Sequence, residues 1–159
     1  MKINKHTWLV YTDGASRGNP GPSGVGIYVV DQDGSQILKD HFYIGEKTNN
    51  QAEYLAVAFA TFLLKNIMLK KEITPDLIFI SDSQLLVRQM DGLYRVKNPT
   101  ISCIKHAIDK NLEDVSCQFK HVLRKENLVA DSLANMGINK KRKIPEKLLR
   151  FSIDHNIPL

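Results

Sequence analysis

Residues 8–30, WLVYTDGASRGNPGPSGVGIYVV, contain the pattern that decides the fold. Runs rich in β-branched and aromatic residues at 6–11 and 25–30 are typical of β-strands. The Gly, Pro and Ser residues between them indicate a loop. An Asp-Gly turn at 31–35 leads to a third apolar run at 37–44. We therefore predict three strands joined by short connections, an antiparallel meander.

Beyond the third strand the apolar spacing changes from that of a strand to that of a helix. Between residues 50 and 69, apolar side chains recur on one helical face. The short apolar run at 77–80 is typical of a buried central strand, which we expect to lie parallel to the first. Further along, the chain predicts helices at 83–90 and 99–112, a strand at 115–122, and a helix at 127–136 that ends before Gly137. This order of elements indicates the α/β class.

The length and composition fit one globular domain. The chain has 159 residues, of which 43% are hydrophobic and 25% charged, and these values exclude global disorder or a collagen-like repeat. The longest apolar stretch, 55–64, is shorter than the roughly 20 residues of a membrane span, so we expect no membrane contact. Two cysteines without CxxC spacing and the lack of a signal peptide predict reduced thiols in a cytoplasmic protein.

The positive charge is concentrated at the C-terminus. The net charge is +5, and residues 138–159 hold six basic and two acidic side chains. We therefore divide the chain into a domain at 1–137 and a basic extension at 138–159. Two interpretations of the extension stay open: it binds a polyanion by counterion release, or it is a solubilising or disordered tail. Its apolar residues suggest that part of it docks: Leu148, Leu149, Phe151 and Ile153.

Four acidic residues stand at the ends of predicted elements. Asp13 follows the first strand and Asp82 the central one, while Glu53 and Asp131 lie in the first turns of two helices. Because the carboxyl ends of parallel strands meet at one edge of a sheet, Asp13 and Asp82 are expected to share a crevice. Each acid also has an ordinary interpretation as a turn or helix-cap residue.

Glu53 fits that ordinary interpretation least well. Helical geometry places it about 60° from Ala56 and about 20° from Ala60, so it flanks the apolar face. A carboxylate in that position needs a partner, and a metal ion is one candidate. Four carboxylates without a His or Cys cluster suit a hard cation, Mg²⁺ or Mn²⁺. Two such ions support phosphoryl transfer by activating water and stabilising the leaving oxygen.

Four segments carry a family resemblance: TDGASRGNPGPSG (12–24), TNNQAEYLA (48–56), SDSQLLV (81–87) and RKENLVADSLAN (124–135). They resemble the signature segments of type 1 ribonuclease H and occur in that family's order. The resemblance implies a five-stranded mixed sheet flanked by helices. It also implies Mg²⁺-dependent endonucleolytic hydrolysis of the RNA strand of an RNA–DNA hybrid, leaving 5′-phosphate and 3′-hydroxyl ends.

The resemblance also assigns roles to individual residues. The four acids become metal ligands, with Asp13 bridging both ions, Glu53 and Asp82 on one side and Asp131 on the other. Thr48 would contact a DNA phosphate. Amides beside the acids suit base edges and the 2′-OH, since amides both donate and accept hydrogen bonds. The amides in question are Asn19, Asn49, Asn50 and Gln84.

His121 stands in the register of a histidine that assists proton transfer or product release in many family members. The surrounding HVLRKEN lacks the glycines of that family's loop, so a structural role at a strand end stays open, as do phosphate contacts by Arg124 and Lys125. The segment QMDGLYRVKNP is much shorter than the basic protrusion of some bacterial members. We expect a free-standing monomer without an obligate protein partner. The rival hypotheses are a DNA nuclease of related fold and a catalytically silent hybrid-binding module.

Overall fold

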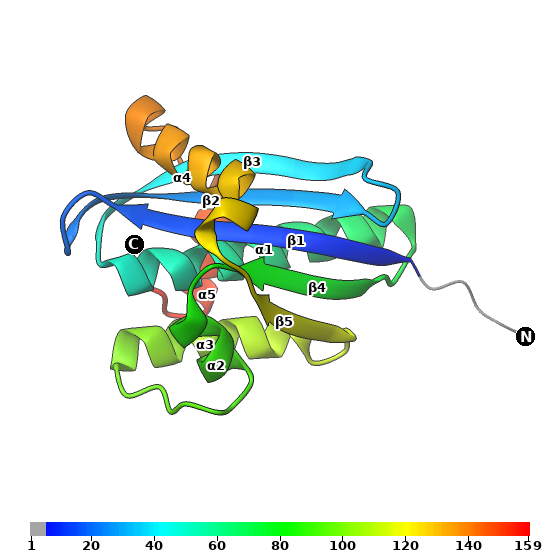
Figure 1. Ribbon diagram of the computed structural model, residues 1–159. Coiled ribbons are helices and arrows are strands. Elements are labelled where there is room, and N and C mark those ends of the chain that lie inside the picture. Colours follow the sequence, from blue (N-terminus) through cyan, green and yellow to red (C-terminus); the bar gives the residue numbers. More distant parts are fainter. Residues whose placement is uncertain (1–5) are drawn as a thin grey trace, which may run out of the picture.

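The computed structural model describes residues 6–159, and Figure 1 shows a central sheet with helices on both of its faces. The strands are β1 (Thr7–Ser16), β2 (Gly21–Asp31), β3 (Gln36–Lys47), β4 (Asp76–Ser81) and β5 (Cys117–His121). The α-helices are α1 (Asn49–Lys71), α2 (Gln84–Met90), α3 (Pro99–Leu112), α4 (Leu128–Lys140) and α5 (Glu146–Asp154), and a 3₁₀ turn spans Arg124–Glu126.

The sheet has five strands in the order β3-β2-β1-β4-β5. The pairs β1–β2 and β2–β3 are antiparallel, whereas β1–β4 and β4–β5 are parallel. This arrangement confirms the predicted mixed sheet, including the parallel central strand. In the register of β1 and β4, Tyr11 lies opposite Ile80 in the last residue pair, so the residues that follow this pair on each strand lie close together at the same end of the strands.

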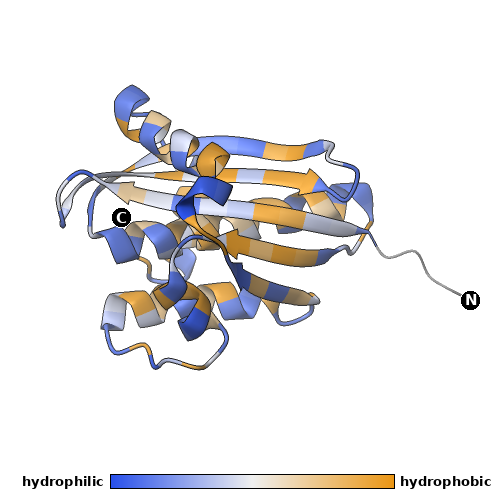
Figure 2. Ribbon diagram, viewed as in Figure 1, coloured by the Kyte–Doolittle hydropathy of each residue, from blue (hydrophilic) through white to orange (hydrophobic). Residues whose placement is uncertain are grey.

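Helix α1 forms the core on one face of the sheet. Most of its apolar residues are fully buried, among them Leu55, Phe59 and Leu64, and α3 packs against it. The helix is long and apolar enough to cross a membrane, but two-thirds of its most apolar window is buried inside the fold. Its apolar character is therefore explained by its place between the sheet and α3, and Figure 2 shows the apolar central strands in front of it.

Helix α4 covers part of the opposite face, in front of the sheet in Figure 1. Glycines on β2 let its backbone come close. A Cβ atom on Gly24 would lie 2.3 Å from the carbonyl oxygen of Ala134, and one on Gly26 would lie 2.2 Å from that of Ala130. Because real Cβ contacts are far longer, both positions need glycine for α4 to sit where it does.

Two predicted boundaries are wrong in ways that have a physical cause. The predicted first strand ended before Asp13, but β1 continues to Ser16 because the Asp-Gly segment pairs with β2, with Asp13 opposite Gly26. The last helix was expected to end before Gly137, but α4 continues to Lys140. Gly137 is a packing residue, since a Cβ there would lie 2.5 Å from the carbonyl oxygen of Phe42. The proposed domain boundary after residue 137 therefore falls inside α4.

The second half of the basic extension docks onto the domain. In α5, Leu148 and Phe151 are buried, and the ring of Phe151 lies 4.9 Å from that of Phe62 on α1. Beyond α5, the thiol of Cys103 on α3 donates to the carbonyl oxygen of His155, 3.2 Å away. Of the predicted docking residues, Leu149 and Ile153 remain exposed. The extension is thus ordered through α5, which rules out a wholly disordered tail.

Candidate active site

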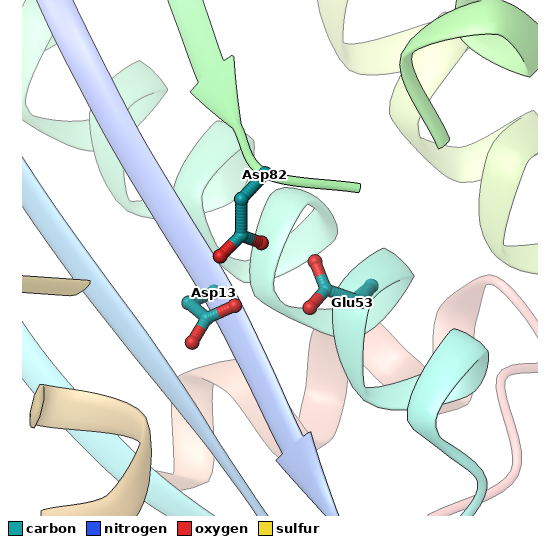
Figure 3. Close-up of side chains that lie close together, drawn as sticks. All are labelled: Asp13, Glu53 and Asp82. Carbon is teal, nitrogen blue, oxygen red and sulfur yellow. The ribbon is translucent and has the colours of Figure 1, made fainter. Parts of the chain in front are cut away.

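Three carboxylates converge at the edge of the sheet where β1 and β4 carry their C-terminal ends. Asp13 comes from β1, Asp82 directly follows β4, and Glu53 projects from α1 (Figure 3). One ligand atom from each lies within 4.8 Å of the other two. The parallel register explains the first two positions, because each stands two residues beyond the paired Tyr11 and Ile80.

Gly14 brings Glu53 to the same point. A Cβ on Gly14 would lie 2.1 Å from the carbonyl carbon of Ala52 and 2.3 Å from the nitrogen of Glu53, so only glycine lets α1 cross β1 here. The Gly14 N–H donates to Glu53 Oε1 at 3.3 Å. We predicted Glu53 in the first turn of this helix, and that prediction is wrong. Glu53 lies in the second turn, because α1 begins at Asn49.

The electrostatics of this cluster favour neutralisation. Burial, followed by the charge of Glu53, raises the pKa of Asp13 far above its ordinary value. Burial also raises the pKa of Glu53, and burial followed by the charge of Asp131 raises that of Asp82. Within residues 6–159, Glu53 Oε2 is buried and has no hydrogen-bond partner. An orphaned buried carboxylate oxygen among other carboxylates is suited to a hard divalent cation.

Asp131 shares the cavity but does not join the three-carboxylate cluster. It lies in the first turn of α4 and lines a cavity of about 460 Å³ together with the other three acids. Its Oδ1 accepts a hydrogen bond from Arg124 Nη2 at 3.3 Å. All four predicted acids therefore line one cavity, and Asp131 forms an ion pair with Arg124 there.

The predicted substrate-binding residues surround the start of α1 and α2. Thr48 caps α1, and its hydroxyl accepts from the Gln51 N–H at 3.1 Å. Asn49 lines the cavity, and its N–H donates to Asn19 Oδ1 at 3.0 Å. Asn50 lies in the first turn of α1, and Gln84 begins α2 with an exposed side chain. Of these five residues only Asn49 lines the cavity, within the part of the chain that the structure describes. The roles of all five stay predictions.

His121 ends β5 and is exposed. Among the described residues it does not line the cavity. Its position at a strand end matches the structural alternative, and a role in proton transfer or product release stays a prediction.

Sequence reasoning missed three polar residues around the acids. Arg17 and Asn135 line the cavity, and Asn135 Nδ2 donates to the backbone oxygen of Asp131 at 3.0 Å. Asn135 follows Asp131 by four residues, so helical spacing alone would have placed both on one face. The buried Asn127 donates from Nδ2 to the Thr12 carbonyl oxygen at 2.9 Å, which ties the start of α4 to β1 beside Asp13.

Comparison with known proteins gives one consistent result. Residues 11–137 match the family model described as "Reverse transcriptase-like". Ribonuclease HI of Halobacterium salinarum is 36% identical over 137 residues, which cover 81% of this chain and 63% of that protein. The bifunctional protein Rv2228c of Mycobacterium tuberculosis is 34% identical over 80% of this chain and 34% of its own length. The chain therefore spans less than two-thirds of these curated relatives.

Solved structures agree with the sequence matches. The crystal structure of RNase H1 from Halobacterium salinarum has a TM-score of 0.78 and 33% identity, over 84% of this chain and 98% of that one. LC11-RNase H1 in complex with an RNA/DNA hybrid also has a TM-score of 0.78, with 38% identity over 84% of this chain and 97% of its own.

Proposed function

Because the chain belongs to the type 1 ribonuclease H family, we propose that it is an endonuclease that hydrolyses the RNA strand of RNA–DNA hybrids. The observation that carries the proposal is the convergence of Asp13, Glu53 and Asp82 within 4.8 Å. Like charges so close are stable as a group only when protons or cations neutralise them. The complex of LC11-RNase H1 with an RNA/DNA hybrid supports the substrate class.

We further propose that these three carboxylates, with Asp131, hold two Mg²⁺ ions, and that Mn²⁺ is an alternative. All the donor groups are hard carboxylate oxygens, and the partnerless Glu53 Oε2 leaves one of them available. When bound, such a pair of ions activates a water and stabilises the leaving oxygen, which yields 5′-phosphate and 3′-hydroxyl ends.

The chain's own residues account for attraction and positioning of the substrate. The guanidinium groups of Arg17 and Arg124 line the acidic cavity and offer donors to phosphate oxygens. Arg124 also holds Asp131 at 3.3 Å, so the carboxylate faces the cavity before a substrate or metal arrives. Arg124 is therefore suited both to orient Asp131 and to contact the backbone of the cleaved strand.

Polar groups at the start of α1 suit the nucleic-acid surface beside the scissile phosphate. The Asn49 side chain can both donate and accept, which fits base edges in the minor groove and the 2′-OH. The backbone of Asn49 is held in place because its N–H donates to Asn19 Oδ1 at 3.0 Å. The Thr48 hydroxyl accepts from Gln51, so its hydrogen remains available to a phosphate oxygen.

We also propose that the protein acts as a cytoplasmic monomer without an obligate protein partner or membrane contact. Cys103 and Cys117 are free thiols, which is what a reducing compartment favours. Light scattering after gel filtration tests the monomer, and a dimer at micromolar concentration would contradict it.

The test of the activity is a comparison of substrates at equal concentration with Mg²⁺: an end-labelled RNA–DNA hybrid, duplex DNA, duplex RNA and single-stranded RNA. We expect cleavage of the RNA strand of the hybrid alone, with phosphatase-sensitive 5′ ends. Asn49→Ala should raise KM for the hybrid, whereas Gln36→Ala, an exposed amide at the start of β3 that does not line the cavity, is the control. Comparable cleavage of duplex DNA would replace the proposal with a DNA nuclease, and hybrid binding without cleavage would replace it with a binding module.

A further inference from the structure

The basic extension divides into two parts with different environments. Residues 146–154 form α5, whose apolar side docks onto the core. Residues 140–143, Lys-Lys-Arg-Lys, comprise the last residue of α4 and the three residues after it, and all four are exposed. These four residues, the 140–143 cluster, form a run of basic side chains that no part of the proposed active site uses.

The cluster is held in a fixed place on the edge strand β3. Lys141 ends α4 in a left-handed conformation with φ of 47°. The next residue accepts a backbone hydrogen bond, since the Tyr43 N–H donates to the Arg142 carbonyl oxygen at 2.9 Å. Lys141 Nζ lies 5.9 Å from the centre of the Tyr43 ring, and the Arg142 guanidinium pairs with Asp40. The basic run is therefore anchored by its backbone and by two side chains.

Most of its charge is not compensated within the protein. Asp40 neutralises Arg142, but Lys140, Lys141 and Lys143 form no ion pair with any residue in the described part of the chain. The pKa of the nearby His41 is lowered, first by burial and then by the charge of Arg142; the charge of Asp40 opposes this shift, and that of Lys140 adds to it. Three lysines thus leave a positive surface at the end of α4.

We propose that the 140–143 cluster binds the sugar–phosphate backbone of the same RNA–DNA hybrid that enters the cavity, at a distance from the scissile phosphate. The inference rests on the proposed function and names a second binding point for its substrate. Helix α4 links the two places, because Asp131 stands in its first turn and Lys140 at its end (Figure 1). Nine residues of helix span roughly 14 Å.

That span suits a duplex. A double helix carries about one phosphate per 1.7 Å of axis, so a hybrid seated at the cavity has many phosphates within this distance. The connection between α2 and α3, residues 91–98, is too short to form a basic protrusion. The 140–143 cluster offers another basic surface that can bind the substrate. Lysine is suited to this task as a mobile point charge that binds the backbone without reading sequence.

The test is the salt dependence of hybrid binding, measured by fluorescence anisotropy with Mg²⁺ in an Asp13→Asn background so that no cleavage occurs. The variant is Lys140→Gln/Lys141→Gln. Its control is Lys70→Gln/Lys71→Gln, which removes two exposed lysines from the last turn of α1, at the opposite end of the view in Figure 1. Both changes remove two charges from a helix C-terminus, so global charge and helix-end effects are matched.

We expect the slope of log K against log salt to become shallower by roughly 0.7–0.9 for each phosphate that the α4 variant no longer neutralises. Affinity at 0.1 M salt should fall about sixfold for each such phosphate. The α1 variant should bind as the Asp13→Asn parent does. Lys143 lies beyond the helix, so Lys143→Gln removes a charge of the cluster without altering α4. This variant should change the slope by the amount expected for a single phosphate. Equal slopes for the α4 variant, the α1 variant and the parent would overturn the inference.

A failure of the second binding point can be distinguished from a failure of the proposed cleavage activity. In the background with Asp13 intact, the α4 variant should raise KM for the hybrid, while the α1 variant should retain the parental KM. A parent that cleaves the hybrid with a KM insensitive to both changes would reject the second binding point and leave the activity standing. A parent that binds the hybrid through the cluster without cleaving it would reject the activity alone.

Discussion

Asp13→Asn should stabilise the metal-free protein even though it removes a proposed metal ligand. Asp13 is 4% exposed and faces two other carboxylates within 4.8 Å. At that separation and an effective dielectric constant of about 20, each pair of ionised carboxylates repels by roughly 3.5 kcal/mol. Ionising Asp13 beside two neighbours would therefore cost about 7 kcal/mol before the desolvation of its charge is counted.

Keeping Asp13 protonated costs less, so the metal-free fold retains the proton. Each pH unit between the ordinary pKa of 3.8 and neutrality costs about 1.4 kcal/mol, which gives an upper bound of about 4 kcal/mol at pH 7. Asparagine keeps the shape without this cost. Allowing for water entry and relaxation of the site, we expect about half of the bound, or roughly 2 kcal/mol, and a rise in Tm of about 4–8 °C.

The effect has a defined pH dependence. The unfolded chain releases the Asp13 proton near pH 3.8, whereas the fold retains it because burial and Glu53 raise the pKa of Asp13. Between about pH 4 and neutrality the unfolded state therefore binds fewer protons, and the parent loses stability as the pH rises. The Asn variant lacks the part of this loss that comes from position 13, so its advantage should grow from pH 4 to pH 7.

The assay is thermal unfolding followed by circular dichroism in EDTA at pH 4, 5.5 and 7. The control is Asp114→Asn, because a hydrogen bond and ion pair with Lys65 hold the pKa of that exposed carboxyl below its usual range. That change should not raise Tm. An Asp13→Asn protein no more stable than the parent at pH 7, or an advantage that does not grow with pH, would refute the electrostatic reasoning.

Three further substitutions, one of them with a control, test how the fold is held together. Phe151→Ala should lower the free energy of unfolding in urea by about 3–5 kcal/mol, because it empties a buried position. Ile153→Ala, at a 73% exposed position of the same helix, should change it by less than about 0.5 kcal/mol, and equal losses would show that α5 does not dock. Gly26→Ala should lower both Tm and hybrid cleavage, since its Cβ would lie 2.2 Å from the Ala130 carbonyl oxygen; an unchanged variant would contradict the packing of α4. Asn127→Ala should cost about 1–3 kcal/mol and lower kcat, since it breaks the bond between α4 and β1; parental unfolding curves and rates would argue against that link.

Much of the fold could be predicted from local patterns because its elements are strongly marked. Alternating and continuous apolar runs indicated the five strands, and the helical spacing between residues 50 and 69 indicated the core helix. What local patterns could not settle was the meaning of two glycines. Gly14 stands in an Asp-Gly pair typical of a turn, and Gly137 stands where helices often stop.

In both cases a distant element decides the outcome. Gly14 stays in β1 because the strand pairs with β2 and because α1 crosses it too closely for any side chain. Gly137 stays helical because α4 presses against the backbone of Phe42. Since such close approaches join residues far apart in the chain, neither turn propensity nor cap propensity can reveal them.

The candidate site shows the same division. The sequence placed Asp13, Glu53 and Asp82 by their motifs and element ends, and the structure brings them together. It did not predict the ion pair between Asp131 and Arg124, which depends on how the 3₁₀ turn leads into α4. Nor could it decide whether the C-terminal extension docks, because apolar residues in a basic tail fit either outcome until their partner, Phe62, is known.

The central claim is that the three converging carboxylates form a metal-dependent centre that cuts RNA in a hybrid. The most direct measurement is cleavage of a labelled RNA–DNA hybrid by the parent and by Asp13→Asn, side by side, as Mg²⁺ is titrated. The account predicts cleavage that rises with Mg²⁺ in the parent and is absent in the variant, whose metal-free fold should be at least as stable as that of the parent. Equal cleavage by both proteins, or parental cleavage that persists in EDTA, would contradict it.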